Sequence, residues 1–173
     1  MFNDFIIVGP ASDPAKVQGL SVTAALKKIA QDGAPFASRA DKSGTHMAEL
    51  RLWKAAEVAE PDKEKWYIQT GQGMLETLMI AGERKGYAFT DRGTFIKYED
   101  SRKEQADLAI IVEGDASLKN QYSVMAVNPA KWENIRYDIA LQYIDWLISP
   151  STQKAIAEFK LLGKQLFFPN AAR

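Results

Sequence analysis

The chain has no cysteine, one histidine and no excess of either charge among its 173 residues. The absence of cysteine excludes disulfides and thiolate metal sites. With a single histidine as well, the chain has too few nitrogen and sulfur ligands for a typical transition-metal site. Lys plus Arg and Asp plus Glu number 22 each, so the bulk charge does not indicate nucleic acid as the main partner. The apolar runs are all far shorter than the roughly 18 residues of a membrane helix.

The N-terminal residues MFNDFIIVGP also lack the features of a secretory leader. They contain no basic residue, and their apolar run, FIIV, is much too short. We therefore expect no signal peptide in this chain. Because the chain opens almost directly on a predicted strand, we also expect it to be a fragment of something longer.

The sequence does contain an alternation of short apolar runs and amphipathic helical patterns. The predicted strands are residues 2–9, 34–38, 86–90, 106–115 and 122–129, and the predicted helices are residues 22–33, 44–60, 71–86, 132–149 and 151–159. Residues 90–100 read as a turn or short helix. The inner faces of the first three helices are expected to carry Val22, Leu26 and Ile29, then Met47, Leu50 and Trp53, then Met74, Leu78 and Ala81. This alternation predicts an α/β fold with a largely parallel sheet.

The segment SRADKSGTH lies between a predicted strand and a predicted helix. In the simplest interpretation, Ser43 or Asp41 only caps the helix by accepting hydrogen bonds from its first free N–H groups. The other interpretation is an anion site, because a helix N-terminus presents unpaired donors and partial positive charge. Ser43 and Thr45 add hydroxyl donors, and Gly44 leaves the N–H groups uncovered. Arg39 supplies a fork of donors suited to tetrahedral oxyanions. Together these features favour the anion site, with Asp41 orienting Arg39 or capping the turn.

Two further segments are weaker candidates for a binding site. GQG before Met74 resembles a dinucleotide loop, but Glu76 stands where the third glycine should be, and no clear strand precedes the segment. It is either a flexible entry to a helix or a second helix N-terminus, at Gly73 and Met74, that faces the same cleft. TDRGT is either a surface ion pair with a turn glycine or, through Thr90 and Arg92, part of a cleft at the carboxyl end of its strand.

The one histidine, His46, invites a comparison with hydrolases that would use Ser43 as nucleophile. The two residues are three positions apart on one helical turn, however, and the G-x-S-x-G elbow is absent. The acidic residues show neither an EF-hand nor a paired catalytic spacing. We therefore predict no enzyme activity, no cofactor and no bound metal cation.

The chain resembles the later part of tungstate-binding proteins of the TupA type, which are extracytoplasmic solute-binding components of ABC importers. The matching segments are FNDFIIVGPASDPA, SRADKSGTH, GQGMLETL followed by YAFTDRGTF, and VNPAKW. The resemblance implies an α/β, type II periplasmic-binding-protein-like fold, whose two lobes close on the ligand. It also implies that Arg39, Ser43, Gly44 and Thr45 contact the oxyanion.

The signal and the first-lobe segment of this family, with its Thr/Ser-rich ligand loop, have no counterpart in the chain. We therefore expect one complete lobe plus the C-terminal part of the other. Residues 6–121 would form lobe two with half of the anion site. Residues 1–5 and 122–173 would supply the hinge strands and the C-terminal remainder of lobe one, with FIIVG and SVMAV as neighbouring strands. The apolar face of the C-terminal helices, left without its cover, is expected to mediate self-association.

These features lead to two hypotheses about function. The first is binding of tungstate, or molybdate, in the periplasm or another extracytoplasmic compartment, and delivery to the membrane subunits of an ABC permease without chemical turnover. The second is a ligand-sensing effector domain of a regulator, since such domains share the two-lobed fold. The sequence shows no helix-turn-helix and its net charge is zero, which favours the first hypothesis.

Overall fold

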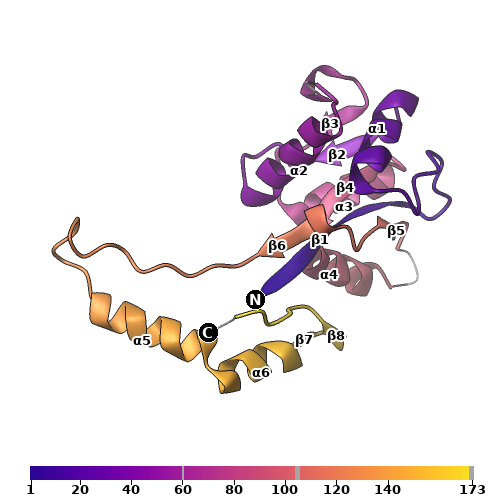
Figure 1. The fold of residues 1–173 in the computed structure, drawn as a ribbon. Helices are drawn as coiled ribbons and strands as arrows, with labels where there is room; N and C mark the ends of the chain where they lie inside the picture. Colours follow the sequence, from indigo (N-terminus) through magenta and orange to yellow (C-terminus); the bar gives the residue numbers. More distant parts are fainter. Residues whose placement is uncertain (60, 104–105, 172–173) are drawn as a thin grey trace. The chain divides into compact units, whose positions relative to one another are not determined.

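The computed structural model describes residues 1–59, 61–103 and 106–171 (Figure 1). The chain divides into two compact units. The large unit is Asp4–Lys119, and the C-terminal unit combines Met1–Asn3 with Asn120–Arg173. The large unit contains the SRADKSGTH, GQG and TDRGT segments, so the candidate site residues all belong to it.

The large unit is built on a mixed β-sheet with the strand order β3-β2-β4-β1-β5. Its strands are β1 (Phe2–Pro10), β2 (Phe36–Ser38), β3 (Tyr67–Gln69), β4 (Tyr87–Asp91) and β5 (Leu108–Val112). β2 runs parallel to β3 and β4, whereas β1 runs antiparallel to both β4 and β5. The prediction of a largely parallel sheet is therefore wrong at β1. The reason is that β1 is inserted between β4 and β5, which are joined by a helix and run in the same direction.

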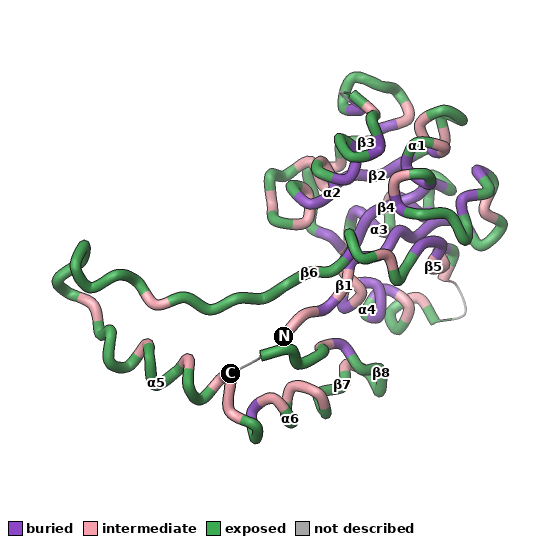
Figure 2. The backbone as a smooth tube through the Cα atoms, in the orientation of Figure 1, coloured by how far each residue is buried: buried purple, intermediate pink, exposed green. Residues whose placement is uncertain are grey.

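Helices cover both faces of this sheet. They are α1 (Val22–Asp32), α2 (Gly44–Ala55), α3 (Met74–Glu83) and α4 (Arg92–Arg102), with the 3-10 turns η1 (Pro61–Lys63) and η3 (Ala116–Leu118). Along β1, Phe5 and Ile7 join a core cluster with α1 and α2, while Ile6 and Val8 join a second cluster with α3 and α4. Because both faces of β1 are buried, the strand is apolar without interruption over these four residues (Figure 2).

The predicted inner faces of α1 and α3 are confirmed, whereas that of α2 is confirmed at Trp53 and wrong at Met47 and Leu50. Met47 is 45% exposed and Leu50 is only half-buried. The buried residues of α2 are Ala48, Glu49 and Leu52 together with the predicted Trp53. A search for apolar spacing cannot find this face, because the carboxylate of Glu49 interrupts it.

Two strands carry the chain between the units. β1 begins in the C-terminal unit and continues in the large unit, and β6 (Lys119–Gln121) pairs with it where the chain returns. The side-chain amide of Asn120 donates to Asn3 Oδ1 at 2.8 Å. β1 therefore has a returning strand as its neighbour, but that strand lies at residues 119–121 and not over SVMAV. The assignment of the two units to lobes stays a prediction.

The strand predicted over residues 122–129 does not form. Most of this segment is exposed, as the mainly green tube between β6 and α5 shows (Figure 2). Met125 is 86% exposed and Val127 is 52% exposed. A strand needs a neighbour to pair its backbone groups, and the described residues place no strand beside residues 123–127. The helix that follows, α5 (Tyr137–Ile148), likewise begins later than the predicted start at Trp132.

The C-terminal unit leaves the apolar face of α5 exposed. Ser149 caps the next helix, α6 (Pro150–Glu158), and Pro150 occupies its first turn, as the sequence predicts. A small sheet follows, formed by β7 (Lys160–Leu161) and β8 (Lys164–Gln165). No residue of α5 is buried, and Tyr143 and Trp146 are 53% and 57% exposed. Within the described part of the chain, this face therefore has no cover.

Candidate functional site

The N-terminus of α2 is open and rich in hydrogen-bond donors. Ser43 is the N-cap, and its side-chain oxygen accepts from His46 N at 3.3 Å, which leaves the hydroxyl proton available to a ligand. The backbone N–H groups of Gly44 and Thr45 have no carbonyl partner one turn earlier in the helix. Gly44 is exposed, and nothing lies within 4 Å of the position that a Cβ would take there. A small anion could therefore approach these donors closely.

Arg39 lies directly after β2 and pairs with Asp41. Its Nε and Nη2 donate to Asp41 Oδ2 at 3.1 and 2.5 Å, while Asp41 Oδ1 accepts the Ser43 N–H at 3.0 Å. Asp41 thus both orients the arginine and caps the turn, the two roles predicted for it. Burial opposes its ionisation, but the hydrogen bonds from Ser43 and the charge of Arg39 outweigh burial and lower the Asp41 pKa to about 2. No described residue accepts a hydrogen bond from Arg39 Nη1, which leaves that nitrogen for an oxyanion.

The loop before α2, residues 39–43, has a strained backbone; we call it the Arg39 loop. Ala40 and Lys42 have φ angles of 49° and 61°, in the left-handed region that residues with a Cβ rarely occupy. Ala40 N–H donates to Ser38 Oγ at 3.3 Å, and Lys42 N–H donates to His46 Nδ1 at 3.0 Å. Burial lowers the pKa of His46, which favours the neutral ring that this second bond requires. Strain held by surrounding contacts in this way is typical of functional sites.

The loop between β3 and α3 is joined to the Arg39 loop by backbone hydrogen bonds. Thr70 N–H donates to Ser38 O at 2.9 Å, and Gly71 N–H donates to Arg39 O at 3.0 Å. The Thr70 hydroxyl also donates to Ser38 O at 2.9 Å. The carbonyl groups of the two peptides on either side of Arg39 are thus fixed by one neighbouring loop.

The GQG segment does follow a strand, contrary to the sequence prediction, because β3 ends just before it. This strand is hard to find in the sequence, since only Tyr67 of its three residues is buried. Gly73 is the exposed N-cap of α3, and the side chain of Met74 is buried in the core that α3 covers. Gly73 therefore lies at the exposed start of α3, where a Cβ would meet Glu76 Oε2 at 2.5 Å, whereas Met74 packs inside.

The TDRGT segment forms the junction of β4 and α4. Thr90 is fully buried. Arg92 donates from Nε and Nη2 to the two carboxylate oxygens of Asp4 at 2.8 and 2.6 Å, and from Nη2 to Glu113 Oε2 at 2.7 Å. The hydrogen bonds to Asp4 and then Glu113 raise the Arg92 pKa above its usual value. Arg92 therefore ties the start of β1 to the end of β5, and two carboxylates balance its charge.

Arg92→Met is expected to lower the free energy of unfolding by roughly 1.5–3 kcal/mol, because Asp4 and Glu113 would lose their charged partner. Urea unfolding followed by circular dichroism measures the change. Arg51→Met, at an exposed position on α2, is the matched control and should change stability very little. An Arg92 variant of native stability would contradict this structural role.

The structure also contains a buried carboxylate that the sequence pattern does not reveal. Glu49, on the inner face of α2, is 2% exposed. Its Oε2 accepts from Ser38 Oγ at 2.8 Å, and its Oε1 accepts from Tyr67 OH at 2.6 Å and from Trp53 Nε1 at 3.0 Å. The one available signal is its position four residues before Trp53, which puts both side chains on the same helix face. Since Ser38 precedes Arg39, the network connects the core with the Arg39 loop.

Burial raises the pKa of Glu49 to about 7, although its three hydrogen bonds favour the ionised form. Folding therefore favours the protonated acid, and its contribution to stability is fully present below about pH 4.5 and lost as the pH rises through 7. We expect the native chain to lose up to about 3 kcal/mol of unfolding free energy over this window, and Glu49→Gln to lose much less. Urea unfolding at a series of pH values measures both curves. If the unfolding free energies of the native chain and of Glu49→Gln changed equally with pH, the raised pKa of Glu49 would be wrong.

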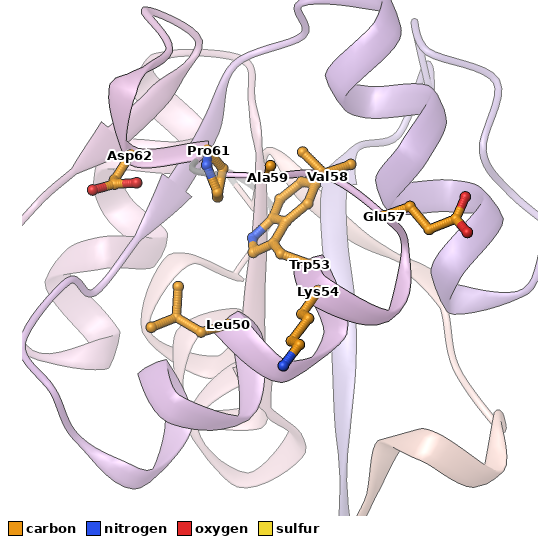
Figure 3. Close-up of a pocket in the computed structure, with 8 residues that line it drawn as sticks. All are labelled: Leu50, Trp53, Lys54, Glu57, Val58, Ala59, Pro61 and Asp62. Atoms are coloured by element: carbon orange, nitrogen blue, oxygen red, sulfur yellow. The ribbon is translucent and has the colours of Figure 1, made fainter.

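A cavity of about 380 Å³ lies at the other end of α2 (Figure 3). Its lining residues are Leu50, Trp53, Lys54, Glu57, Val58, Ala59, Pro61 and Asp62. Two carboxylates, Glu57 and Asp62, accompany the one cation, Lys54. The cavity is therefore poorly suited to a dianion, unlike the N-terminal end of the same helix.

Two general features of the described residues bear on the kind of site. None of their helices is long and apolar enough to cross a lipid bilayer. They also form no group of three or more His, Asp or Glu side chains that could hold a metal ion. The arrangement in the large unit that best suits a small anion is the N-terminus of α2 with Arg39.

Comparison with known proteins identifies relatives along the whole chain. Residues 1–151 match the family described as PBP superfamily domain. The tungstate-binding protein TupA of Campylobacter jejuni subsp. jejuni is 47% identical over 171 residues, which are 99% of this chain and 63% of that protein. The chain thus spans less than two thirds of the length of this relative.

Two solved structures extend the similarity to the fold. The tungstate binding protein TupA from Desulfovibrio alaskensis G20 is 56% identical, with a TM-score of 0.93 over 99% of this chain and 69% of that one. The tungstate ABC transporter from Geobacter sulfurreducens is 43% identical, with a TM-score of 0.72 over 92% of this chain and 66% of that one. These similarities confirm the α/β, periplasmic-binding-protein-like fold. The chain belongs to the PBP superfamily and, within it, to the family of TupA-type tungstate-binding proteins.

Proposed function

We propose that this chain binds tungstate, or molybdate, as part of a solute-binding protein that delivers the oxyanion to an ABC permease. The observation that carries the proposal is Arg39, which Asp41 holds beside the open N-terminus of α2. The relatives named for tungstate binding support the ligand, and the relative named as a tungstate ABC transporter supports a permease as partner. Membership of this family also supports a periplasmic or other extracytoplasmic location.

The donors in this region match the needs of a tetrahedral dianion. We assign the contacts to Arg39 Nη1, the Ser43 hydroxyl and the backbone N–H groups of Gly44 and Thr45. The helix N-terminus adds about half a positive charge to that of the arginine. Asp41 offsets part of the arginine charge, but it also fixes the guanidinium, so little side-chain freedom is lost when the anion binds.

The remaining cleft candidates have different roles. We retain Gly73 as a secondary contributor, because it exposes the N-terminus of α3 and its loop is bonded to the Arg39 loop. Met74 and Thr90 are buried, and Arg92 is paired with two carboxylates. We assign these three residues to the support of the sheet.

The geometry supports binding without turnover. Ser43 Oγ accepts from the backbone N–H of His46, and the His46 ring accepts from Lys42 N–H at Nδ1. Among the described residues, no hydrogen bond joins the imidazole to the Ser43 hydroxyl, whereas the base of a hydrolase would make one. Incubation with generic ester substrates should give no product above the buffer rate.

We assign the large unit to lobe two, with boundaries near the predicted residues 6 and 121. The C-terminal unit would then supply the hinge and the C-terminal remainder of lobe one. Its exposed apolar face on α5 and α6 supports self-association of the chain.

Titration of the isotope-labelled chain with sodium tungstate tests the proposed site. We expect the amide resonances of residues 39–46 to shift, because the ligand would contact or polarise these groups directly. The resonances around Arg92 and around the Trp53 cavity serve as internal controls and should stay in place. Shifts centred on either control region, or no shift at high tungstate concentration, would overturn the proposal.

A further inference from the structure

A chain of hydrogen bonds runs from the core to the Arg39 loop. Ala40 N–H donates to Ser38 Oγ at 3.3 Å, and the Ser38 hydroxyl in turn donates to Glu49 Oε2 at 2.8 Å. Ser38 and Glu49 are both buried, with exposed fractions of 0% and 2%. Because each bond in such a chain polarises the next, a negative charge on Glu49 strengthens the bond that Ser38 accepts from Ala40.

The bond to Ala40 matters because of the backbone conformation at that residue. A φ of 49° is unfavourable for alanine, so the turn persists only while its contacts hold it. Ala40 separates Arg39 from Asp41, and the side chains of these two residues are paired. If Ala40 relaxed to a negative φ, the chain would leave Arg39 in another direction and Asp41 would no longer meet the guanidinium.

We infer that Glu49 is a positioning residue for oxyanion binding, which acts through Ser38 to hold the Ala40 turn and so the Arg39–Asp41 pair. The inference rests on the proposed function, since that pair is its central element. Glu49 itself is buried and does not reach the ligand. Its two remaining hydrogen bonds, from Tyr67 and Trp53, fix the carboxylate in the core.

Other ionisable groups on the surrounding elements must be distinguished from Glu49. They are Tyr67 on β3, Asp62 on η1, Arg39 and Asp41 in the Arg39 loop, and His46 on α2. Burial and then the charge of Glu49 raise the pKa of Tyr67 far above neutrality, and the Asp41 pKa is about 2. The His46 pKa is lowered from 6.5. A transition near pH 7 in this region therefore belongs to Glu49, and one at lower pH belongs to His46.

The first test needs no ligand and follows the Ala40 amide resonance of the full chain during a pH titration. We expect a transition with its midpoint near pH 7 in the native chain. The transition should vanish in Glu49→Gln, and also in Ser38→Ala, where the charge remains but the link to Ala40 is cut. Tyr67→Phe is the matched control: it removes a donor to Glu49 but keeps the link, so the transition should persist at higher pH. An Ala40 transition that survives unchanged in Ser38→Ala would overturn the inference.

The second test measures tungstate affinity in the same variants, at a pH above the Ala40 transitions of both the native chain and Tyr67→Phe, so that Glu49 is ionised in both. Ser38→Ala and Glu49→Gln should each weaken binding by roughly three- to tenfold, and the double variant should lose little more, because both act along one chain of bonds. Tyr67→Phe loses a buried hydrogen bond to the same carboxylate, yet should keep the native affinity to within about twofold. If affinity falls in step with stability in all three variants, the role of Glu49 is only structural.

The two tests separate this inference from the proposed function. If the Ala40 transition depends on Ser38 but tungstate shifts no resonance, the proposed function fails while the link between Glu49 and the loop stands. If tungstate binds the native chain and Ser38→Ala equally well, the positioning role is wrong. Should Glu49→Gln not fold, Ser38→Ala alone decides both tests, since it leaves the carboxylate with its two other donors.

Discussion

Arg39→Lys is expected to weaken tungstate binding by roughly ten- to a hundredfold, a loss of about 1.5–3 kcal/mol. Lysine keeps the positive charge but replaces a planar fork with a single ammonium group. In the native chain, Nε and Nη2 hold Asp41 while Nη1 stays available to the ligand. A single ammonium group cannot both donate to Asp41 and contact the ligand in this geometry. Amide-shift titrations of the native and variant chains give the two dissociation constants.

Arg51→Lys is the matched control for this experiment. Arg51 is an exposed arginine on the same helix, so its replacement should leave the affinity unchanged. The amide spectrum of Arg39→Lys should otherwise match that of the native chain, which would exclude general unfolding as the cause. Equal tungstate affinity in Arg39→Lys and the native chain would show that Arg39 is not the principal contact.

The second large effect is expected in the assembly of the chain. The C-terminal unit has an open depression of about 560 Å³. It is lined by Met1, Tyr143, Trp146, Leu147, Ser151, Thr152, Ala155, Ile156, Phe159 and Phe167. Most of these side chains are apolar, and exposed apolar surfaces of this kind tend to find partners. We therefore expect the native chain to elute as an oligomer, and the double variant Tyr143→Lys/Trp146→Lys to be a monomer.

Size-exclusion chromatography with light scattering measures the mass of each species. Gln142→Lys adds a positive charge at an exposed polar position of the same helix and should leave the oligomer intact. A native chain that is a monodisperse monomer would contradict self-association through this face. An oligomer that persists in the double variant would place the contact elsewhere.

Local patterns in the sequence are enough to predict a helix whose apolar residues all pack on one side, against the same core. The spacing of Val22, Leu26 and Ile29 is sufficient to predict α1, because the N-cap, the C-cap and the buried face of this helix all lie within a few turns. Strand pairing is different, since it depends on residues far apart in the chain. The position of β1 between β4 and β5 is a property of the whole sheet, and Val124 and Met125 belong to a strand-like run that finds no partner.

The same distinction applies to the candidate site. The Arg39, Asp41 and Ser43 contacts could be anticipated, because capping and ion pairing act over a few positions in one segment. Glu49 could not, because two of its donors come from β2 and β3 and only the fold brings them to α2. A buried carboxylate with these partners also explains why apolar spacing places only Trp53 correctly on the buried face of α2.

The most direct test of oxyanion binding at α2 is anomalous diffraction at a tungsten absorption edge from crystals of the chain grown with tungstate. We predict one principal peak within hydrogen-bonding distance of the Arg39 guanidinium and of the backbone N–H groups of Gly44 and Thr45. A principal peak beside Arg92, or in the cavity at Trp53, with none at α2, would contradict the proposed site.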